Sequence, residues 1–130
     1  MEIESFIILS NKNSSILSKT FMINMGIKSY IIERPLKVLE ILENREIDFI
    51  FLDLDFSNNE SIELIDKLSH LGKQLNLIIT SLNNKEINRE NINVLGFIAK
   101  PFSIKELEIL VPRFLNKINK KHSQRKHISV

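Results

Sequence analysis

The sequence of 130 residues has no cysteine and no tryptophan, and it has only three glycines and three prolines. Without cysteine, disulfide bonds and thiolate metal sites are excluded, and a reducing compartment such as the cytoplasm is the expected location. The few glycines form no phosphate-cradling loop, which argues against a nucleotide site of the glycine-rich kind.

Long apolar runs and an export signal are missing as well. The longest apolar stretches fall far short of the roughly twenty residues that cross a bilayer. The start, MEIESFIILS, carries acids where a signal peptide carries positive charge. We therefore expect no membrane span and no export by that route.

Charge is unevenly distributed along the chain. Residues 117–130 hold five basic residues and no acid, whereas residues 1–116 hold 13 bases and 16 acids, a net charge of −3. A body of this sign is not a nucleic-acid surface. We expect one folded domain over residues 1–118 and a basic, disordered tail over residues 119–130. That tail is either simply solvated or a handle for nucleic acid or an acidic partner.

Five short runs rich in Ile and Phe are typical of buried strands. Their residues are apolar at successive positions, as in strands of a parallel sheet that is covered on both faces. The runs are Phe6–Leu9, Tyr30–Ile32, Phe49–Leu52, Leu77–Thr80 and Gly96–Ala99.

Segments with helical spacing alternate with these runs. The spacing predicts helices over Ser14–Met25, Leu36–Leu42, Glu60–Leu71 and from Ser103, where Ser103 and Glu106 have the capping-box spacing. Lys85–Leu95 is predicted as a marginal helix because its asparagines have poor helix propensity. Pro112 is expected to bend or end the last helix.

This alternation predicts a doubly wound α/β fold, with a five-stranded parallel sheet and right-handed crossovers. In such sheets, ligands lie beyond the carboxyl ends of the strands. Four of the five strand ends carry polar residues: Ser10–Asn13, Asp53 with Asp55, Thr80–Ser81, and Lys100–Phe102. We expect Asp53, Thr80 and Lys100 to converge at one edge, as in an anion pocket with a nucleophilic carboxylate.

Three stretches, DFIFLDLDF, LIITS and KPFSIKEL, occur in this order at those strand ends. Together they resemble the receiver domain of bacterial response regulators, and the resemblance covers residues 5–118. It implies the flavodoxin-like (βα)5 fold and a role in two-component phosphorelay signalling. The chain would then accept phosphate from a histidine kinase or phosphotransfer protein and bind a downstream protein partner, without being an enzyme beyond self-phosphorylation and slow dephosphorylation.

The resemblance also assigns roles to residues. Asp53 is the phospho-acceptor, Lys100 pairs with it and then with phosphate, and the Thr80 hydroxyl donates to the phosphoryl group. Phe97 occupies the position of a switch aromatic, although it is equally a candidate core residue. Pro101 and Phe102 belong to the same switch and interface region.

The sequence departs from the family at the end of the first strand. The family has two adjacent acids there that help to hold Mg²⁺, and this chain has Ser10 and Asn11. Asn11 offers only a neutral carbonyl oxygen, and Asp55 is either a loop acid or a replacement ligand beside Asp53. A Mg²⁺ site here is therefore expected to be weak or absent.

Two readings of Asp53 follow. Either Asp53 is a working phospho-acceptor in a metal-poor pocket, or Asp53 and Lys100 form a permanent ion pair in a pseudo-receiver. The second reading makes the protein an interaction module that acts without phosphorylation. A third reading, a small flavodoxin-like ligand-binding protein or enzyme, has little support.

Overall fold

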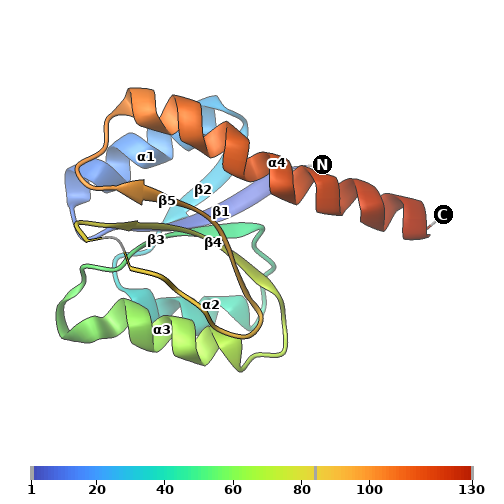
Figure 1. Ribbon diagram of the computed structural model, residues 1–130, viewed down its shortest axis with the longest axis horizontal. Helices are drawn as coiled ribbons and strands as arrows, with labels where there is room; N and C mark the ends of the chain where they lie inside the picture. Colours follow the sequence, from blue (N-terminus) through green and yellow to red (C-terminus); the bar gives the residue numbers. More distant parts are fainter. Residues whose placement is uncertain (1, 84, 130) are drawn as a thin grey trace.

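The computed structural model describes residues 2–83 and 85–129, with the side chains of residues 119–129 outside the described part. One five-stranded parallel sheet has the strand order β2-β1-β3-β4-β5. The predicted doubly wound α/β fold is thus confirmed (Figure 1). The strands are β1 (Ile3–Ile8), β2 (Ile27–Ile31), β3 (Phe49–Asp53), β4 (Leu75–Ser81) and β5 (Ile92–Ala99).

Helices cover both faces of the sheet. On one face lie α1 (Lys12–Asn24) and α4 (Ile104–Ser129), and on the other lie α2 (Val38–Leu42) and α3 (Glu60–Ser69) (Figure 1). Short 3₁₀ helices, η1 (Pro35–Lys37) and η2 (Ser57–Asn59), precede α2 and α3. Because both faces are covered, β3 is buried along its whole length, as its unbroken apolar run predicts.

Each face has its own apolar core. Phe51 and Ile78 face α1 and α4, while Ile50 and Leu77 face α2 and α3. Fully burying one such side chain contributes about 1.5–3 kcal/mol. Both cores therefore stabilise β3 and β4, the two central strands that carry Asp53 and Thr80.

The helix ends follow local sequence chemistry. The Asn11 side chain accepts a hydrogen bond from the Ser14 N–H at 2.9 Å, which caps α1. Gly26, with φ of 83°, follows the end of α1 in a conformation that glycine adopts without strain. The predicted capping box is confirmed, because Ser103 Oγ accepts from the Glu106 N–H and Glu106 Oε1 accepts from the Ser103 N–H.

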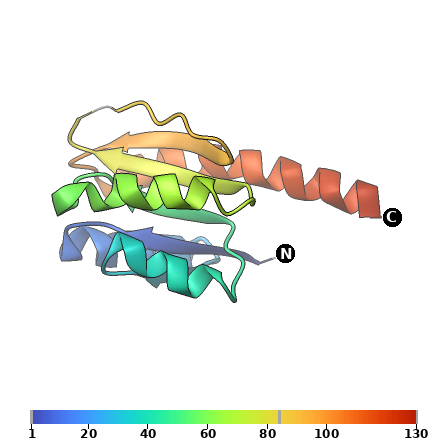
Figure 2. The same ribbon diagram turned by 90° about the horizontal axis from the view of Figure 1, so that it is seen from below.

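The prediction of a marginal helix over Lys85–Leu95 is wrong. Residues 85–91 are irregular, and β5 already begins at Ile92. Two asparagine side chains form long-range hydrogen bonds instead. Asn93 Nδ2 donates to Asn76 Oδ1 across the β4–β5 ladder, and Asn91 Nδ2 donates to the Ser69 carbonyl at the end of α3. The α2/α3 face therefore has an irregular segment beside β5 in place of a helix (Figure 2).

The last helix, α4, continues through Pro112, so the proline does not end it, and the expected bend at this position stays a prediction. Val111 and Leu115 on either side are buried, and this packing outweighs the roughly 3 kcal/mol that an interior proline costs. The backbone of α4 extends to Ser129, whereas the side chains of the basic tail, residues 119–130, lie outside the described part. The boundary at residue 118 stays a prediction.

Within residues 2–83 and 85–129, no helix is long and apolar enough to cross a membrane.

Candidate functional site

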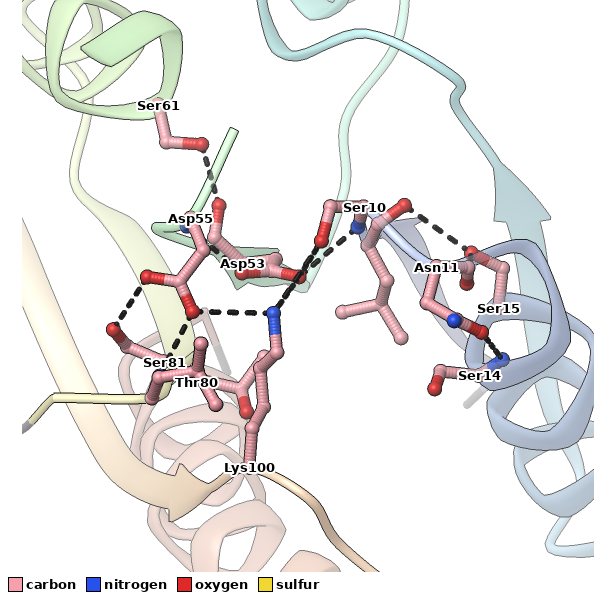
Figure 3. Close-up of polar contacts among 12 residues, drawn as sticks. Ser10, Asn11, Ser14, Ser15, Asp53, Asp55, Ser61, Thr80, Ser81 and Lys100 are labelled. Atoms are coloured by element: carbon pink, nitrogen blue, oxygen red, sulfur yellow. Dashed lines mark hydrogen bonds and ion pairs between the residues drawn. The ribbon is translucent and has the colours of Figure 1, made fainter. Parts of the chain in front are cut away.

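The carboxyl ends of β1, β3, β4 and β5 meet at one edge of the sheet, where they bring the predicted polar residues together (Figure 3). Register places Asp53 directly beside Thr80. Lys100 follows the end of β5, and Ser10 follows the end of β1. This is the convergence that the strand-end pattern predicts.

Asp53 is almost completely buried, with 1 % of its surface exposed. Its Oδ2 accepts hydrogen bonds from Lys100 Nζ at 2.8 Å, Ser10 Oγ at 2.7 Å and the Ser10 N–H at 3.0 Å. Its Oδ1 accepts from the Asp55 N–H at 2.8 Å. A buried carboxylate needs this compensation, since an unpaired charge in the interior is strongly unfavourable.

Ser10 has a role that the sequence did not predict. It belongs to the polar strand end Ser10–Asn13, and both its hydroxyl and its amide donate to Asp53. The signal for this role is its place two residues beyond the end of β1, the strand that neighbours β3. Ser10 thus neutralises part of the Asp53 charge by hydrogen bonding, where an acid would add to it.

Asn11 is not brought to the pocket. Its side chain turns to Ser14 at the start of α1, and Figure 3 shows it directed away from Asp53. Its side-chain oxygen is therefore committed to capping α1.

Asp55 does reach the pocket. Its Oδ2 lies 3.1 Å from Lys100 Nζ and accepts the Leu82 N–H at 2.8 Å, and its Oδ1 accepts the Ser81 hydroxyl at 2.8 Å. Lys100 thus lies between two carboxylates (Figure 3).

Titration follows from this geometry. Partial burial acts to raise the pKa of Asp55, but hydrogen bonds from Leu82, Ser81 and Lys100 outweigh it, so that the pKa is lowered overall. Burial likewise acts to lower the pKa of Lys100, and hydrogen bonds to Asp53 and Asp55 raise it above its usual value. At neutral pH the Asp55 carboxylate and the Lys100 ammonium are therefore both charged.

The donor set does not fit a magnesium ion. Mg²⁺ prefers several oxygen ligands with one or two carboxylates. Here the ammonium of Lys100 already lies between Asp53 and Asp55, and Asn11 faces elsewhere. The described residues contain no group of three His, Cys, Asp or Glu side chains placed to hold a metal.

Thr80 is buried beside Asp53 in the ladder, but its hydroxyl donates to the Ile98 carbonyl on β5. Phe97, the residue before Ile98 on β5, is half-buried and packs against the core on the α2/α3 side. A hydrogen bond therefore connects the end of β4 with the segment of β5 that carries Phe97.

The remaining predicted residues follow Lys100. Pro101 is exposed after a cis peptide bond. Phe102 is half-buried, and its ring lies 5.7 Å from that of Phe51, in the core on the α1/α4 side. Phe102 thus anchors the chain where it turns from β5 into α4.

Comparison with known proteins agrees with the sequence resemblance. The family model for the response regulator receiver domain matches residues 8–111. A search of curated proteins finds no match.

Solved structures with the same fold are numerous. A CheY-like receiver domain from Methylobacillus flagellatus has 17 % identity and a TM-score of 0.69, with 88 % of this chain and 99 % of that chain covered. For the receiver domain of an HD domain-containing protein from Pseudomonas fluorescens Pf-5, the values are 13 %, 0.75, 92 % and 99 %. For that of a putative Luxo repressor protein from Vibrio parahaemolyticus, they are 14 %, 0.74, 94 % and 96 %. Identities this low show a shared fold.

Proposed function

The chain belongs to the response regulator receiver family, and on that basis we propose that it is a receiver module that accepts a phosphoryl group on Asp53. The observation that carries the proposal is the buried ion pair between Asp53 Oδ2 and Lys100 Nζ, 2.8 Å long, at the carboxyl edge of the sheet. Proteins of this family take part in two-component signalling and interact with histidine kinases or other proteins. They are generally not enzymes.

The chemistry follows from the positions of the side chains. An oxygen of Asp53 attacks the phosphorus of a phosphohistidine, and the P–N bond breaks with its electron pair going to the histidine nitrogen. The product is an acyl phosphate on Asp53. Lys100 is already in contact with the acceptor and moves its donors to the phosphoryl oxygens, where charge-assisted hydrogen bonds are strongest.

Thr80 supplies the connection to a partner surface. Its hydroxyl donates to the Ile98 carbonyl in this structure, and a phosphoryl group on the neighbouring Asp53 offers a more strongly charged acceptor. Rotation of Thr80 towards phosphate then releases the carbonyl next to Phe97. We propose that a partner protein recognises this change around Phe97, Pro101 and Phe102.

Magnesium has a reduced role in this proposal. Receiver domains generally bind Mg²⁺ at an acidic pocket, where the ion neutralises phosphate charge. In this chain Ser10 and Lys100 provide the compensation around Asp53. We infer that Mg²⁺ binds weakly or is absent, and that phosphoryl uptake depends little on its concentration.

A second candidate function is a pseudo-receiver that binds its partner without phosphorylation. The burial of Asp53 favours it, because four donors occupy the carboxylate and only 1 % of the residue is exposed. In both candidates the protein acts in the cytoplasm through protein–protein contact. The basic tail has a secondary role, and its side chains lie outside the described part.

Intact-mass spectrometry after incubation with acetyl phosphate tests the first candidate. We expect a phosphoryl adduct on the unmodified protein and none on Asp53→Asn, at low and high Mg²⁺ alike. Ser10→Asp restores an acid beside Asp53 and should make uptake rise with Mg²⁺. An adduct on Asp53→Asn would show that the acceptor is another residue. Absence of any adduct on the unmodified protein would favour the pseudo-receiver.

A further inference from the structure

Asp55 has more partners than a loop acid needs. Its carboxylate accepts from the Ser81 hydroxyl and the Leu82 amide at the end of β4, each at 2.8 Å, and lies 3.1 Å from Lys100 Nζ after β5. Only 23 % of its side chain is exposed. It therefore connects the ends of β3, β4 and β5 through one negative group.

The three groups that contact Asp55, namely the Lys100 ammonium, the Ser81 hydroxyl and the Leu82 amide, are also the kinds of donor that an anion bound to Asp53 requires. A phosphoryl group carries nearly two negative charges and is stabilised by ammonium, hydroxyl and amide donors. Lys100 Nζ is shared between Asp53 and Asp55, while Ser81 and Leu82 are already bonded to Asp55. An anion of protein origin thus holds part of the pocket before any phosphate arrives.

The charges add to the competition. Asp53 and Asp55 share a single ammonium, so the approaching phosphoryl donor is a third anionic centre around one cation. After transfer the phosphoryl group, with nearly two negative charges, replaces the single charge of the Asp53 carboxylate beside Asp55. For a like charge about 6 Å away, at an effective dielectric of about 40, repulsion changes an equilibrium or rate by about tenfold.

We propose that Asp55 is a positioning residue that restrains phosphoryl transfer to Asp53, because its carboxylate holds Lys100 and the Ser81–Leu82 end of β4 in the resting protein. The inference rests on the proposed role of Asp53 as the acceptor. When Asp53 is phosphorylated, Asp55 gives up Lys100 to the phosphoryl oxygens, and the end of β4 becomes free to follow Thr80.

The test measures the rate of uptake from acetyl phosphate by intact mass. In this reaction an Asp53 oxygen attacks phosphorus, the bond from phosphorus to the acetate oxygen breaks, and acetate leaves with the electron pair. We expect Asp55→Asn to react about tenfold faster than the unmodified protein, because the amide keeps an acceptor for Leu82 but loses the charge that holds Lys100. Asp55→Glu should restore the slow rate.

A matched control removes a charge elsewhere. Asp66 on α3 pairs with Arg89, outside the pocket, so Asp66→Asn changes the net charge equally and should leave the rate unchanged. The excess rate of Asp55→Asn should also shrink with added salt, which a purely structural change would not produce.

The outcomes separate this inference from the proposed function. If the unmodified protein is phosphorylated and Asp55→Asn reacts no faster, the restraint is refuted and Asp53 remains the acceptor. If only Asp55→Asn is phosphorylated, the restraint is supported and the unmodified protein is a pseudo-receiver. If neither reacts, both ideas fail.

Hydrogen exchange gives a second measurement that does not depend on phosphate. The Leu82 amide should exchange faster in Asp55→Asn than in the unmodified protein, because a neutral acceptor holds it less strongly than a carboxylate. Equal exchange of this amide would contradict the claim that Asp55 fixes the end of β4.

Discussion

At the scale of single residues, Asp53 and its neighbours show how a buried charge is tolerated. Three donor residues surround the carboxylate, and each comes from a different segment: Ser10 after β1, Asp55 after β3 and Lys100 after β5. The site is therefore assembled only when the sheet is complete. Removing one partner leaves a buried charge partly uncompensated, and this strongly destabilises the folded protein.

Asp55 gives a prediction about acid stability. Its pKa is lowered in the folded protein, so the unfolded chain takes up a proton at a higher pH than the folded chain does. Its stabilisation is present above the ordinary carboxyl value of 3.8 and is lost as the pH falls through the folded-state pKa. The difference in unfolding free energy between the unmodified protein and Asp55→Asn should therefore shrink on acidification.

Urea unfolding of both proteins from about pH 7 to about pH 3 measures this difference. A gap that stays constant over this range would show that the Asp55 carboxylate contributes through shape and not through its charge. The stabilisation from Lys100 depends on pH in the opposite direction. Its pKa is raised in the folded protein, so its contribution to the unfolding free energy is present below pH 10.5 and is lost as the pH rises beyond that value.

The sequence located Asp53, Thr80 and Lys100 because strand ends in a parallel sheet meet at one edge, and the structure brings all three there. It could not assign Ser10 or Asn11. Adjacent residues at a strand end point in different directions, and only the backbone decides that Ser10 faces Asp53 while Asn11 caps α1. A spacing pattern contains no information on that choice.

At the scale of elements, β5 is the instructive case. The segment Lys85–Leu95, which leads into β5 and includes its start, has helical spacing, yet Asn91 and Asn93 have tertiary partners in α3 and β4. Asn91 also adopts a positive φ of 65°, which asparagine tolerates and most residues do not. Long-range hydrogen bonds thus decided the element, and they cannot be seen in a local pattern.

Gly96 is the point where β5 accepts α4. A Cβ built at this position would overlap the ring of Phe114, which packs against the strand from α4. We predict that Gly96→Ala lowers the unfolding free energy by about 1–3 kcal/mol, because the ring must leave its place. Thermal or urea unfolding of the purified variant measures the loss.

A double-mutant cycle isolates the cause. In a Phe114→Leu background the same Gly96→Ala change should cost less than about 0.5 kcal/mol, since the shorter side chain leaves room for the methyl group. An equal cost in both backgrounds would mean that β5 needs glycine for its own backbone conformation and not for the contact with Phe114.

At the scale of the whole molecule, the two apolar cores stabilise the fold and the polar edge of the sheet carries the candidate site. Apolar residues on both faces fix the positions of β3 and β4, and the edge beyond these strands is then free to carry charged groups. The sequence predicted this arrangement because short unbroken apolar runs followed by polar residues are typical of strands that are buried along their length and open to ligands at their ends. It could not predict the missing helix beside β5.

The extent of the folded domain leads to the last prediction. Among the described side chains, Ile118 is the last member of the core on the α1/α4 side, and it is buried. A chain that ends at residue 120 keeps every described core residue. It should unfold within about 0.5 kcal/mol of the complete chain, whereas Ile118→Ala in the complete chain should cost about 2–5 kcal/mol.

Urea unfolding of the three proteins at one pH and salt concentration provides the comparison. Losing residues 121–130 removes three of the five basic residues beyond position 116, so the shortened chain also changes net charge; repeating the comparison at higher salt separates this electrostatic effect. A large loss of stability on shortening, at both salt concentrations, would mean that the basic segment packs on the domain and that the boundary near residue 118 is misplaced. A small loss would make that segment available for a partner, because the fold would not need it.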